Sequence, residues 1–187
     1  MAGSLWVLVG PSGSGKTSLA KALPEQVTGL RRAVTCTTRP RRAGEIEGVD
    51  YRFVSDPEFD AMLSGGGLVE WTAYGGAHYG LPADQFARHP EADWICVLDQ
   101  AGIHHLRDRF GRERVRAVFL APPTGDDLAA RMRARGSTEA EIQARLATVA
   151  RELSAAEDCD YRIETARPFA DVLSSLAELI EGTRAIA

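Results

Sequence analysis

A glycine-rich stretch near the start of the chain has the residue types and spacing of a phosphate-binding loop. Residues 10–17 read GPSGSGKT and match G-x-x-x-x-G-K-[ST] at every fixed position. Glycines let consecutive backbone N–H groups turn toward phosphate oxygens, and the N-terminus of a following helix adds partial positive charge. We therefore expect this segment to bind a nucleoside triphosphate, taken to be ATP. The residues expected to contact it are Gly10, Ser12, Gly13, Ser14, Gly15, Lys16, Thr17 and Ser18.

Two side chains of this loop supply chemistry that the backbone lacks. Lys16 is expected to reach the β- and γ-phosphates as a compact charge, and the Thr17 hydroxyl is expected to ligate Mg²⁺. Lys16 and Lys21 are the only lysines. A GTPase that reads guanine through [NT]-K-x-D needs a lysine further along the chain, so an ordinary GTPase is excluded. Lys21 is expected to be a solvated helix residue.

A second cluster of charge follows in an otherwise slightly acidic chain of net charge −4. Arg39, Arg41 and Arg42 lie within four positions, and Tyr51 comes nine residues after the last of them. Guanidinium groups bind phosphate oxygens in a fork and stay charged, and a phenol adds one more donor. The cluster therefore suggests a second phosphate, on an acceptor. A solvated basic turn is the alternative that these residues alone leave open.

Apolar runs alternate with helical patterns over most of the chain. Runs at 4–9, 93–98, 115–121 and 161–164 predict buried strands, and patterns at 100–110, 124–135, 138–157 and 168–184 predict helices. A helix is also expected directly after the glycine-rich loop. Such alternation is typical of α/β proteins, in which a central parallel sheet lies between layers of helices.

The stretch from about 34 to 90 has a different pattern. The segments RAVTCT, DYRFVS and LVEWTAYGGAHYG alternate like antiparallel strands, with Gly75-Gly76 as a hairpin turn. Ser55 and Glu58 form a capping-box signature for a short helix at 56–64. We expect a small mixed or antiparallel β insertion on the α/β core.

Composition limits the remaining classes of function. A chain of 187 residues suits one domain, and its acidic balance argues against general affinity for nucleic acid. No apolar run approaches the ~18 residues of a membrane span, so no membrane partner is expected. Cys36, Cys96 and Cys159 are interpreted as reduced thiols, which favours a cytoplasmic location.

Three segments together resemble the guanylate kinase family. TCTTRPRRAGEIEGVDYRFVS follows that family's S-x-T-T-R-x-x-R-x-G-E-x-x-G-x-D-Y pattern, LVEWTAYGGAHYG its E-W…Y-G segment, and FLAPPT its strand before the lid. The resemblance implies one P-loop nucleoside monophosphate kinase domain over 1–187. Its core would comprise about 1–33, 91–123 and 158–187, its acceptor-binding region about 34–90, and its helical lid about 124–157. The chain itself is expected to be a monomer or a homodimer.

The resemblance also implies roles for individual residues. Those that would hold the phosphate of GMP are Arg39, Arg42, Tyr51 and Tyr79. Those that would face the base are Thr35, Glu70 and Asp99. A carboxylate accepts from both N1–H and N2–H₂ of guanine, and adenine offers no matching pair. For Asp99, which ends an apolar run, a role near Mg²⁺ competes with base recognition.

The lid would add positive charge during phosphoryl transfer. Arg131 and Arg135 are spaced i, i+4 and share a helix face, and Arg145 lies on the next helix. With Lys16 and Arg42, these arginines are the expected catalytic residues, because phosphoryl transfer depends on positioning and charge neutralisation. No side-chain base is required, since the acceptor phosphate is already ionised.

Three positions depart from the family pattern. Leu81 stands where a Ser or Thr is usual, Thr165 where an Asn is common near the donor adenine, and Asp99 is a single acid where two are usual. The resemblance implies ATP-dependent phosphorylation of GMP, or of its deoxy form, to the diphosphate. Two alternatives stay open: a kinase of another phosphorylated acceptor such as ribose 1,5-bisphosphate, and a non-catalytic interaction module.

Overall fold

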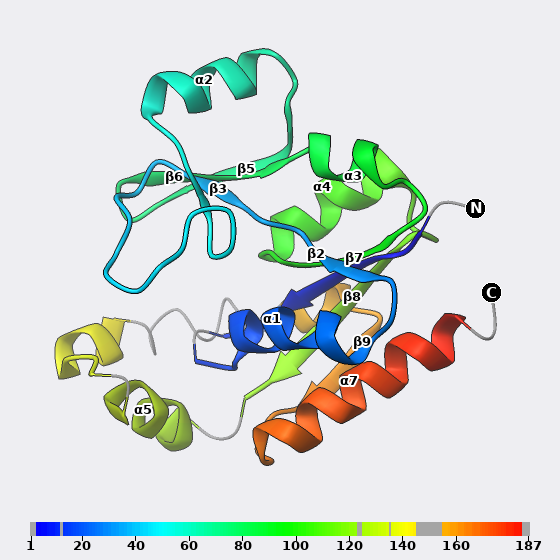
Figure 1. Cartoon of the computed structure of the whole chain (residues 1–187). Helices are drawn as coiled ribbons and strands as arrows, with labels where there is room; N and C mark the ends of the chain where they lie inside the picture. Colours follow the sequence, from blue (N-terminus) through cyan, green and yellow to red (C-terminus); the bar gives the residue numbers. More distant parts are fainter. Residues whose placement is uncertain (1–2, 12, 123–124, 135, 145–154, 185–187) are drawn as a thin grey trace.

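The computed structural model describes residues 3–11, 13–122, 125–134, 136–144 and 155–184. Its centre is a parallel sheet with the strand order β2-β7-β1-β8-β9. The strands are β1 (Leu5–Val9), β2 (Leu30–Arg32), β7 (Asp93–Val97), β8 (Val115–Ala121) and β9 (Tyr161–Glu164). Figure 1 shows this sheet between α1 (Lys16–Gln26) and α7 (Phe169–Arg184) on one side and α4 (Gln100–Phe110) on the other. The predicted α/β class and its four predicted core strands are confirmed; β2 was not predicted as a strand of this sheet.

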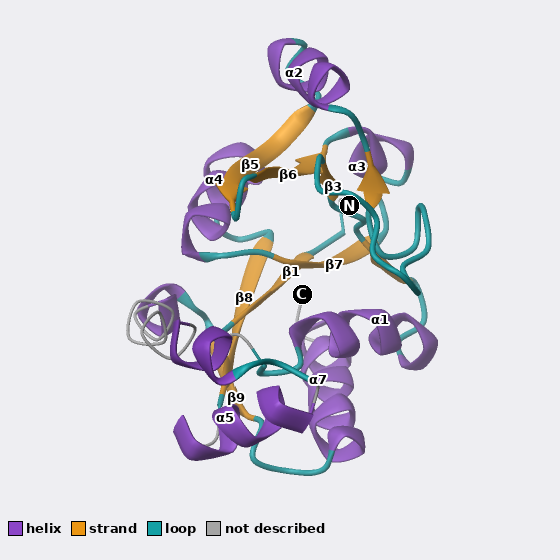
Figure 2. Ribbon diagram, turned by 90° about the vertical axis from the view of Figure 1, so that its left-hand side faces the viewer, coloured by secondary structure: helices purple, strands orange, loops and turns teal. Residues whose placement is uncertain are grey.

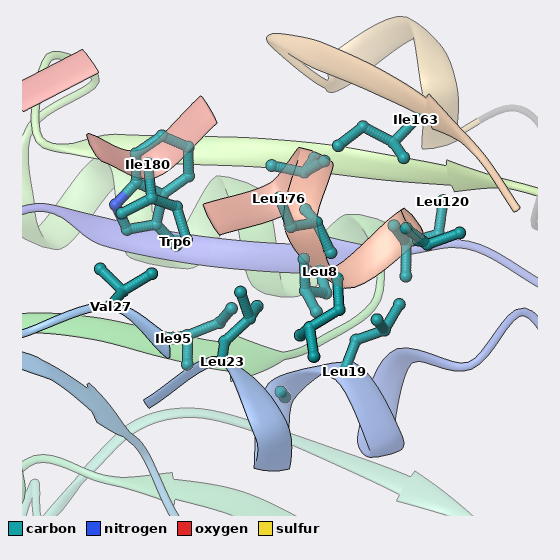
Figure 3. Packing of buried hydrophobic residues seen from close by; sticks show 14 of the residues in the cluster. Trp6, Leu8, Leu19, Leu23, Val27, Ile95, Leu120, Ile163, Leu176 and Ile180 are labelled. Atoms are coloured by element: carbon teal, nitrogen blue, oxygen red, sulfur yellow. The ribbon is translucent and has the colours of Figure 1, made fainter. Parts of the chain in front are cut away.

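Burial of β1 explains why its sequence is a continuous apolar run. Its side chains alternate between two cores: Trp6 and Leu8 pack with α1 and α7, whereas Leu5, Val7 and Val9 pack with α4. Figure 3 shows the first of these cores, with Trp6 and Leu8 reaching toward Leu176 and Ile180. Strands of a parallel sheet covered on both faces need apolar residues at every position.

A second sheet has the order β4-β3-β6-β5 and lies above the first (Figure 2). Its strands are β3 (Cys36–Thr37), β4 (Arg52–Phe53), β5 (Leu68–Tyr74) and β6 (Ala77–Pro82). β3 and β4 are parallel, and the other pairs are antiparallel. Gly75 and Gly76 form the predicted turn at φ 60° and 78°, and the capping box of Ser55 and Glu58 starts α2 (Asp56–Ser64). The predicted mixed insertion is confirmed.

The predicted strand RAVTCT is wrong in one respect, because the chain changes sheets within it. Arg32 ends β2 in the central sheet, and Cys36 begins β3 in the second sheet. Between them, the Gln85 side chain accepts from Val34 N (2.7 Å) and donates to Val34 O (2.9 Å). Gln85 lies on α3 (Asp84–Arg88), which was not predicted. This amide satisfies backbone groups that neither sheet pairs.

The segment after β8 differs in part from the predicted helices. α5 spans Gly125–Ala134, and residues 139–144 are helical. The helix predicted at 138–157 would include residues 155–157, but Ala155–Asp158 form a 3₁₀ helix. Arg107 donates to Asp158 O at 2.8 Å and also pairs with Asp160 at 2.8 Å, and these contacts turn the chain into β9. None of the described helices is long and apolar enough to cross a membrane.

Candidate active site

The glycine-rich loop runs from β1 into α1 and is shaped by its glycines. Gly10, Gly13 and Gly15 have φ of 146°, 87° and 93°, in the region that side chains disfavour. A Cβ on Gly10 would lie 2.6 Å from Leu120 O, so the loop passes close to β8. The Lys16 ammonium folds back over the loop and donates to Gly10 O (2.5 Å) and Pro11 O (2.8 Å). The Lys16 ammonium is therefore held at the loop by two backbone carbonyls.

A pocket of about 340 Å³ adjoins this loop. Its lining residues are Gly13, Ser14, Gly15, Ser18, Leu19, Ala134, Thr165, Arg167, Phe169 and Val172. The Ser14 hydroxyl is buried and has no hydrogen-bond partner within the described chain. Thr17 and Ser18 are exposed on the first turn of α1, and Ser12 lies outside the described residues. The structure thus has a hollow directly beside the loop that the sequence predicts to bind a triphosphate.

Arg167 and Phe169 in this pocket were missed by the sequence analysis. Both follow β9, and in open α/β sheets ligands bind at the carboxyl ends of the strands. That rule was the only available signal for them. Thr165, a departure from the family pattern, donates its hydroxyl to Ala121 O at 2.9 Å. It lines the pocket and ties β9 to β8.

Arg39, Tyr51 and Tyr79 lie together on the second sheet and its loop. The Arg39 guanidinium is 5.5 Å from the centre of the Tyr51 ring, and the Tyr51 and Tyr79 rings are 6.0 Å apart. Burial, followed by the neighbouring Tyr79, raises the pKa of Tyr51. Two phenols and one guanidinium thus meet at one place, as phosphate binding requires.

Glu45 orients Arg39, a role that the sequence analysis missed. Its carboxylate accepts two hydrogen bonds from the Arg39 guanidinium, at 2.7 and 3.1 Å, and a third from Arg42 N at 2.8 Å. These bonds to Glu45 raise the pKa of Arg39, and Arg39 in turn lowers the pKa of Glu45. Arg41 and Arg42 have exposed side chains. Glu45, in the turn that follows the arginines, therefore fixes the position of the Arg39 guanidinium.

Lys21 lies on the exposed surface of α1, as the sequence analysis expected, but it also has a partner that the sequence did not indicate. Its ammonium forms an ion pair with Asp50, the residue before Tyr51. Lys21 lies four residues after Thr17, so both side chains project from one face of α1. The loop that carries Tyr51 is thereby attached to the helix that starts at the glycine-rich loop.

Glu70 on β5 is only 7% exposed although it is ionisable. Within the described chain, no hydrogen bond or ion pair involves its carboxylate. Burial raises the pKa of Glu70 to about 7, and the nearby Asp99 adds to the shift. Asp99 itself caps α4, accepting from Gly102 N at 2.9 Å. Thr35 is half-buried, and its carbonyl accepts from Arg52 N at 3.0 Å.

Glu70 and Tyr79 share one face of the second sheet. Glu70 pairs with Leu81, and Thr72 pairs with Tyr79, two residues before Leu81 on β6. Residues two apart on a strand, and residues directly opposite across an antiparallel ladder, point to the same face. The other face carries His78, whose ring stacks on Phe59 of α2 at 5.2 Å. The face with Glu70 and Tyr79 is the one that α2 leaves uncovered.

Several predicted residues cannot be placed at this site. Arg135 and Arg145 lie outside the described residues, and of Arg131 only its position in α5 is described. In the described residues, no group of three His, Cys, Asp or Glu side chains is arranged to hold a metal ion.

Cys36, Cys96 and Cys159 are free thiols, and burial raises the pKa of each.

Comparison with known proteins agrees with this geometry. The model of the guanylate kinase family matches residues 2–183. A guanylate kinase of Bradyrhizobium diazoefficiens is 37% identical over 98% of this chain and 87% of its own length. One of Synechococcus sp. is 42% identical over 84% and 85%. The crystal structure of guanylate kinase from Anaplasma phagocytophilum superposes with a TM-score of 0.79 at 27% identity, covering 97% of this chain and 86% of that one. The chain belongs to the guanylate kinase family.

Proposed function

We propose that this chain transfers the γ-phosphoryl group of ATP to GMP, or to deoxy-GMP, and releases ADP and the diphosphate. The observation that carries the proposal is the shared sheet face of Tyr79 and Glu70. This face carries Tyr79, which belongs to the proposed phosphate-binding cluster, and the buried carboxylate of Glu70, which has no partner among the described residues. A nucleoside monophosphate whose base offers two N–H donors complements both, and guanine is such a base.

The transfer needs alignment rather than a side-chain base. A phosphate oxygen of GMP attacks the γ-phosphorus in line, that P–O bond forms, and the bond to the β-phosphate oxygen breaks as ADP leaves. Backbone N–H groups of the glycine-rich loop and Lys16 hold the triphosphate. Arg39, Tyr51 and Tyr79 hold the acceptor phosphate. Donors fixed in advance lower the barrier because they need no rearrangement as charge shifts.

We assign further positive charge to Arg42 and to the lid arginines Arg131, Arg135 and Arg145. Arg42 is exposed at the end of the acceptor cluster, so its guanidinium has room to meet a bound phosphate. We further propose that the chain is divided into a core, an acceptor-binding region at about 34–90 and a lid at about 124–157. The cytoplasmic location and the monomeric or homodimeric state stay predictions.

The residues of the loop fit a magnesium ion that arrives with ATP. Mg²⁺ usually keeps several waters and takes one or two protein ligands besides the phosphates, so it needs no cage of carboxylates. The exposed Thr17 hydroxyl at the start of α1 is the side chain that would ligate it. When bound, the ion would neutralise charge on the β- and γ-phosphates. We assign Asp99 to the base side, because it lies close enough to Glu70 to raise its pKa.

The buried Glu70 carboxylate favours an acceptor that carries a nucleobase. Ribose 1,5-bisphosphate has no N–H donors, so it would leave Glu70 buried and unpaired, which is unfavourable. Likewise, a non-catalytic module would have no use for the curled triphosphate loop. The comparisons give no support to either alternative.

A panel of acceptors tests the proposal. Purified protein with ATP and Mg²⁺ is incubated separately with GMP, deoxy-GMP, AMP, CMP, UMP and ribose 1,5-bisphosphate, and ADP release is measured. We expect fast release with GMP and weak release with AMP, CMP and UMP. Equal or faster release with ribose 1,5-bisphosphate would overturn the assignment. In Glu70→Ala the preference for GMP over AMP should disappear; if it persisted, Glu70 would not read the base.

A further inference from the structure

Lys21 connects the two halves of the proposed site, although it belongs to neither. It lies on α1, one turn beyond Thr17, and its ammonium pairs with the Asp50 carboxylate. The Asp50 side chain is 15% exposed and that of Lys21 is 41% exposed. The ion pair is therefore partly exposed to solvent, with Asp50 as its more buried partner.

Further contacts hold the loop around Asp50. Its second carboxylate oxygen accepts from Ile46 N at 2.8 Å, which closes the turn. Arg32, at the end of β2, donates to Val49 O and to Asp50 O, the latter at 3.1 Å. Lys21, followed by the Ile46 amide, lowers the pKa of Asp50, so this carboxylate is ionised at neutral pH. The loop is thus attached to α1 by one cation and to the edge of the central sheet by another.

The next residue along the chain is Tyr51, whose ring contacts Arg39 and Tyr79. A shift of Asp50 therefore moves the phenol that we assign to the acceptor phosphate. The Lys21–Asp50 pair crosses from the helix of the triphosphate loop to the acceptor cluster.

We propose that Lys21 is a positioning residue, which holds the acceptor-phosphate cluster in register with the helix of the triphosphate loop. This inference rests on the proposed function. A displaced Tyr51 phenol would donate poorly to the acceptor phosphate, so loss of the Lys21–Asp50 pair would weaken the binding of GMP. A partly exposed ion pair contributes little to folding stability, so the effect of Lys21 falls on acceptor binding rather than on the fold.

Variants that differ only in charge test this role. Lys21→Met keeps the length of the side chain without its charge, and Asp50→Asn keeps an acceptor for Ile46 N. Each should raise the KM for GMP on the order of tenfold, with the KM for ATP and the melting temperature nearly unchanged. Lys21→Arg retains the ion pair and should restore the wild-type KM. The double variant should be no worse than either single one, because both remove the same contact.

Hydrogen exchange provides a readout that does not depend on turnover. Backbone amides of residues 46–51 should exchange faster in Lys21→Met and at the wild-type rate in Lys21→Arg. Arg88→Met is the matched control, because it breaks an exposed ion pair, Arg88–Asp84 on α3, in which no residue assigned to either site takes part.

Three results would overturn the inference: an unchanged KM for GMP in Lys21→Met, multiplicative effects in the double variant, or unchanged exchange at residues 46–51. Failure of the proposed function would look different, as a wild-type chain that releases no ADP in response to GMP.

Discussion

Leu81 lies directly opposite Glu70 in the β5–β6 ladder, and a register shift between Leu68 and Glu70 puts Val69 beside them. With this bulge, two residues of β5 oppose one of β6, so Val69 and Glu70 both turn toward the side of Leu81. Leu81 is fully buried. The Glu70 carboxylate therefore lies beside aliphatic side chains, where its charged form is unfavourable until a ligand supplies hydrogen-bond donors.

The first prediction follows from the raised pKa of Glu70, about 7 against an ordinary 4.5. The folded state then binds more protons than the unfolded state between those values, so stability falls as pH rises through that window. Glu70→Gln should remove a penalty of about 2–3 kcal/mol at pH 8, raising the melting temperature by roughly 5–10 °C. At pH 5 the gain should be much smaller.

Thermal unfolding at the two pH values measures this difference. Glu25→Gln on the exposed surface of α1 is the control and should change neither value. An equal gain at pH 5 and pH 8 would show that Glu70 is ionised as easily as a surface glutamate.

Features decided by neighbours in sequence could be predicted from the sequence. The loop at 10–17, the capping box of Ser55 and the Gly75-Gly76 turn depend on local backbone geometry, and each was found. Buried strands such as β1 were found because burial on both faces leaves an apolar run. The α/β class followed from the order of these elements.

Features decided by distant residues could not be predicted in this way. Strand alternation places Val69 and Glu70 on opposite faces, and only the bulge turns them to the same one. The partner of Lys21 lies 29 residues away, and no pattern links the two. Glu45 is close to Arg39 in sequence, but nothing in that spacing says that it accepts a fork of hydrogen bonds rather than facing solvent.

The second prediction concerns the fork that Arg39 makes with Glu45. A lysine at this position keeps the charge but cannot hold the glutamate and a phosphate in fixed geometry at once. Arg39→Lys should raise the KM for GMP roughly tenfold or more, because a lost hydrogen bond to a charged group is worth about 1.5–3 kcal/mol and about 1.4 kcal/mol is a factor of ten. Arg41→Lys, two residues away and exposed, is the matched control and should behave as wild type. Similar kinetics for the two variants would remove Arg39 from the phosphate site.

The third prediction addresses the pocket beside the glycine-rich loop. Phe169 is 49% exposed and lines that pocket, an arrangement suited to a flat base packed against the ring. Phe169→Ala should raise the KM for ATP about tenfold, as expected when an aromatic contact of 1–2 kcal/mol is lost. The KM for GMP should stay within about twofold. Leu63→Ala, an exposed apolar residue on α2, controls for general loss of surface contacts; if it matched Phe169→Ala, the pocket would not be the donor site.

The fourth prediction contrasts the kinetic effects of substituting Lys16 and Lys21. Lys16 donates to the carbonyls of Gly10 and Pro11 over the mouth of the loop, within reach of phosphates that would replace those partners. Because charge develops on the transferring phosphoryl group, Lys16→Met should lower kcat by about 10²–10³-fold, the usual loss when one preorganised donor is removed. Lys21→Met should instead change KM for GMP and leave kcat nearly intact. Steady-state kinetics of both variants with varied ATP and varied GMP separate these effects. If Lys16→Met retained substantial kcat, the loop would not be the donor site, whereas a fall of kcat in Lys21→Met would place Lys21 in the chemistry itself.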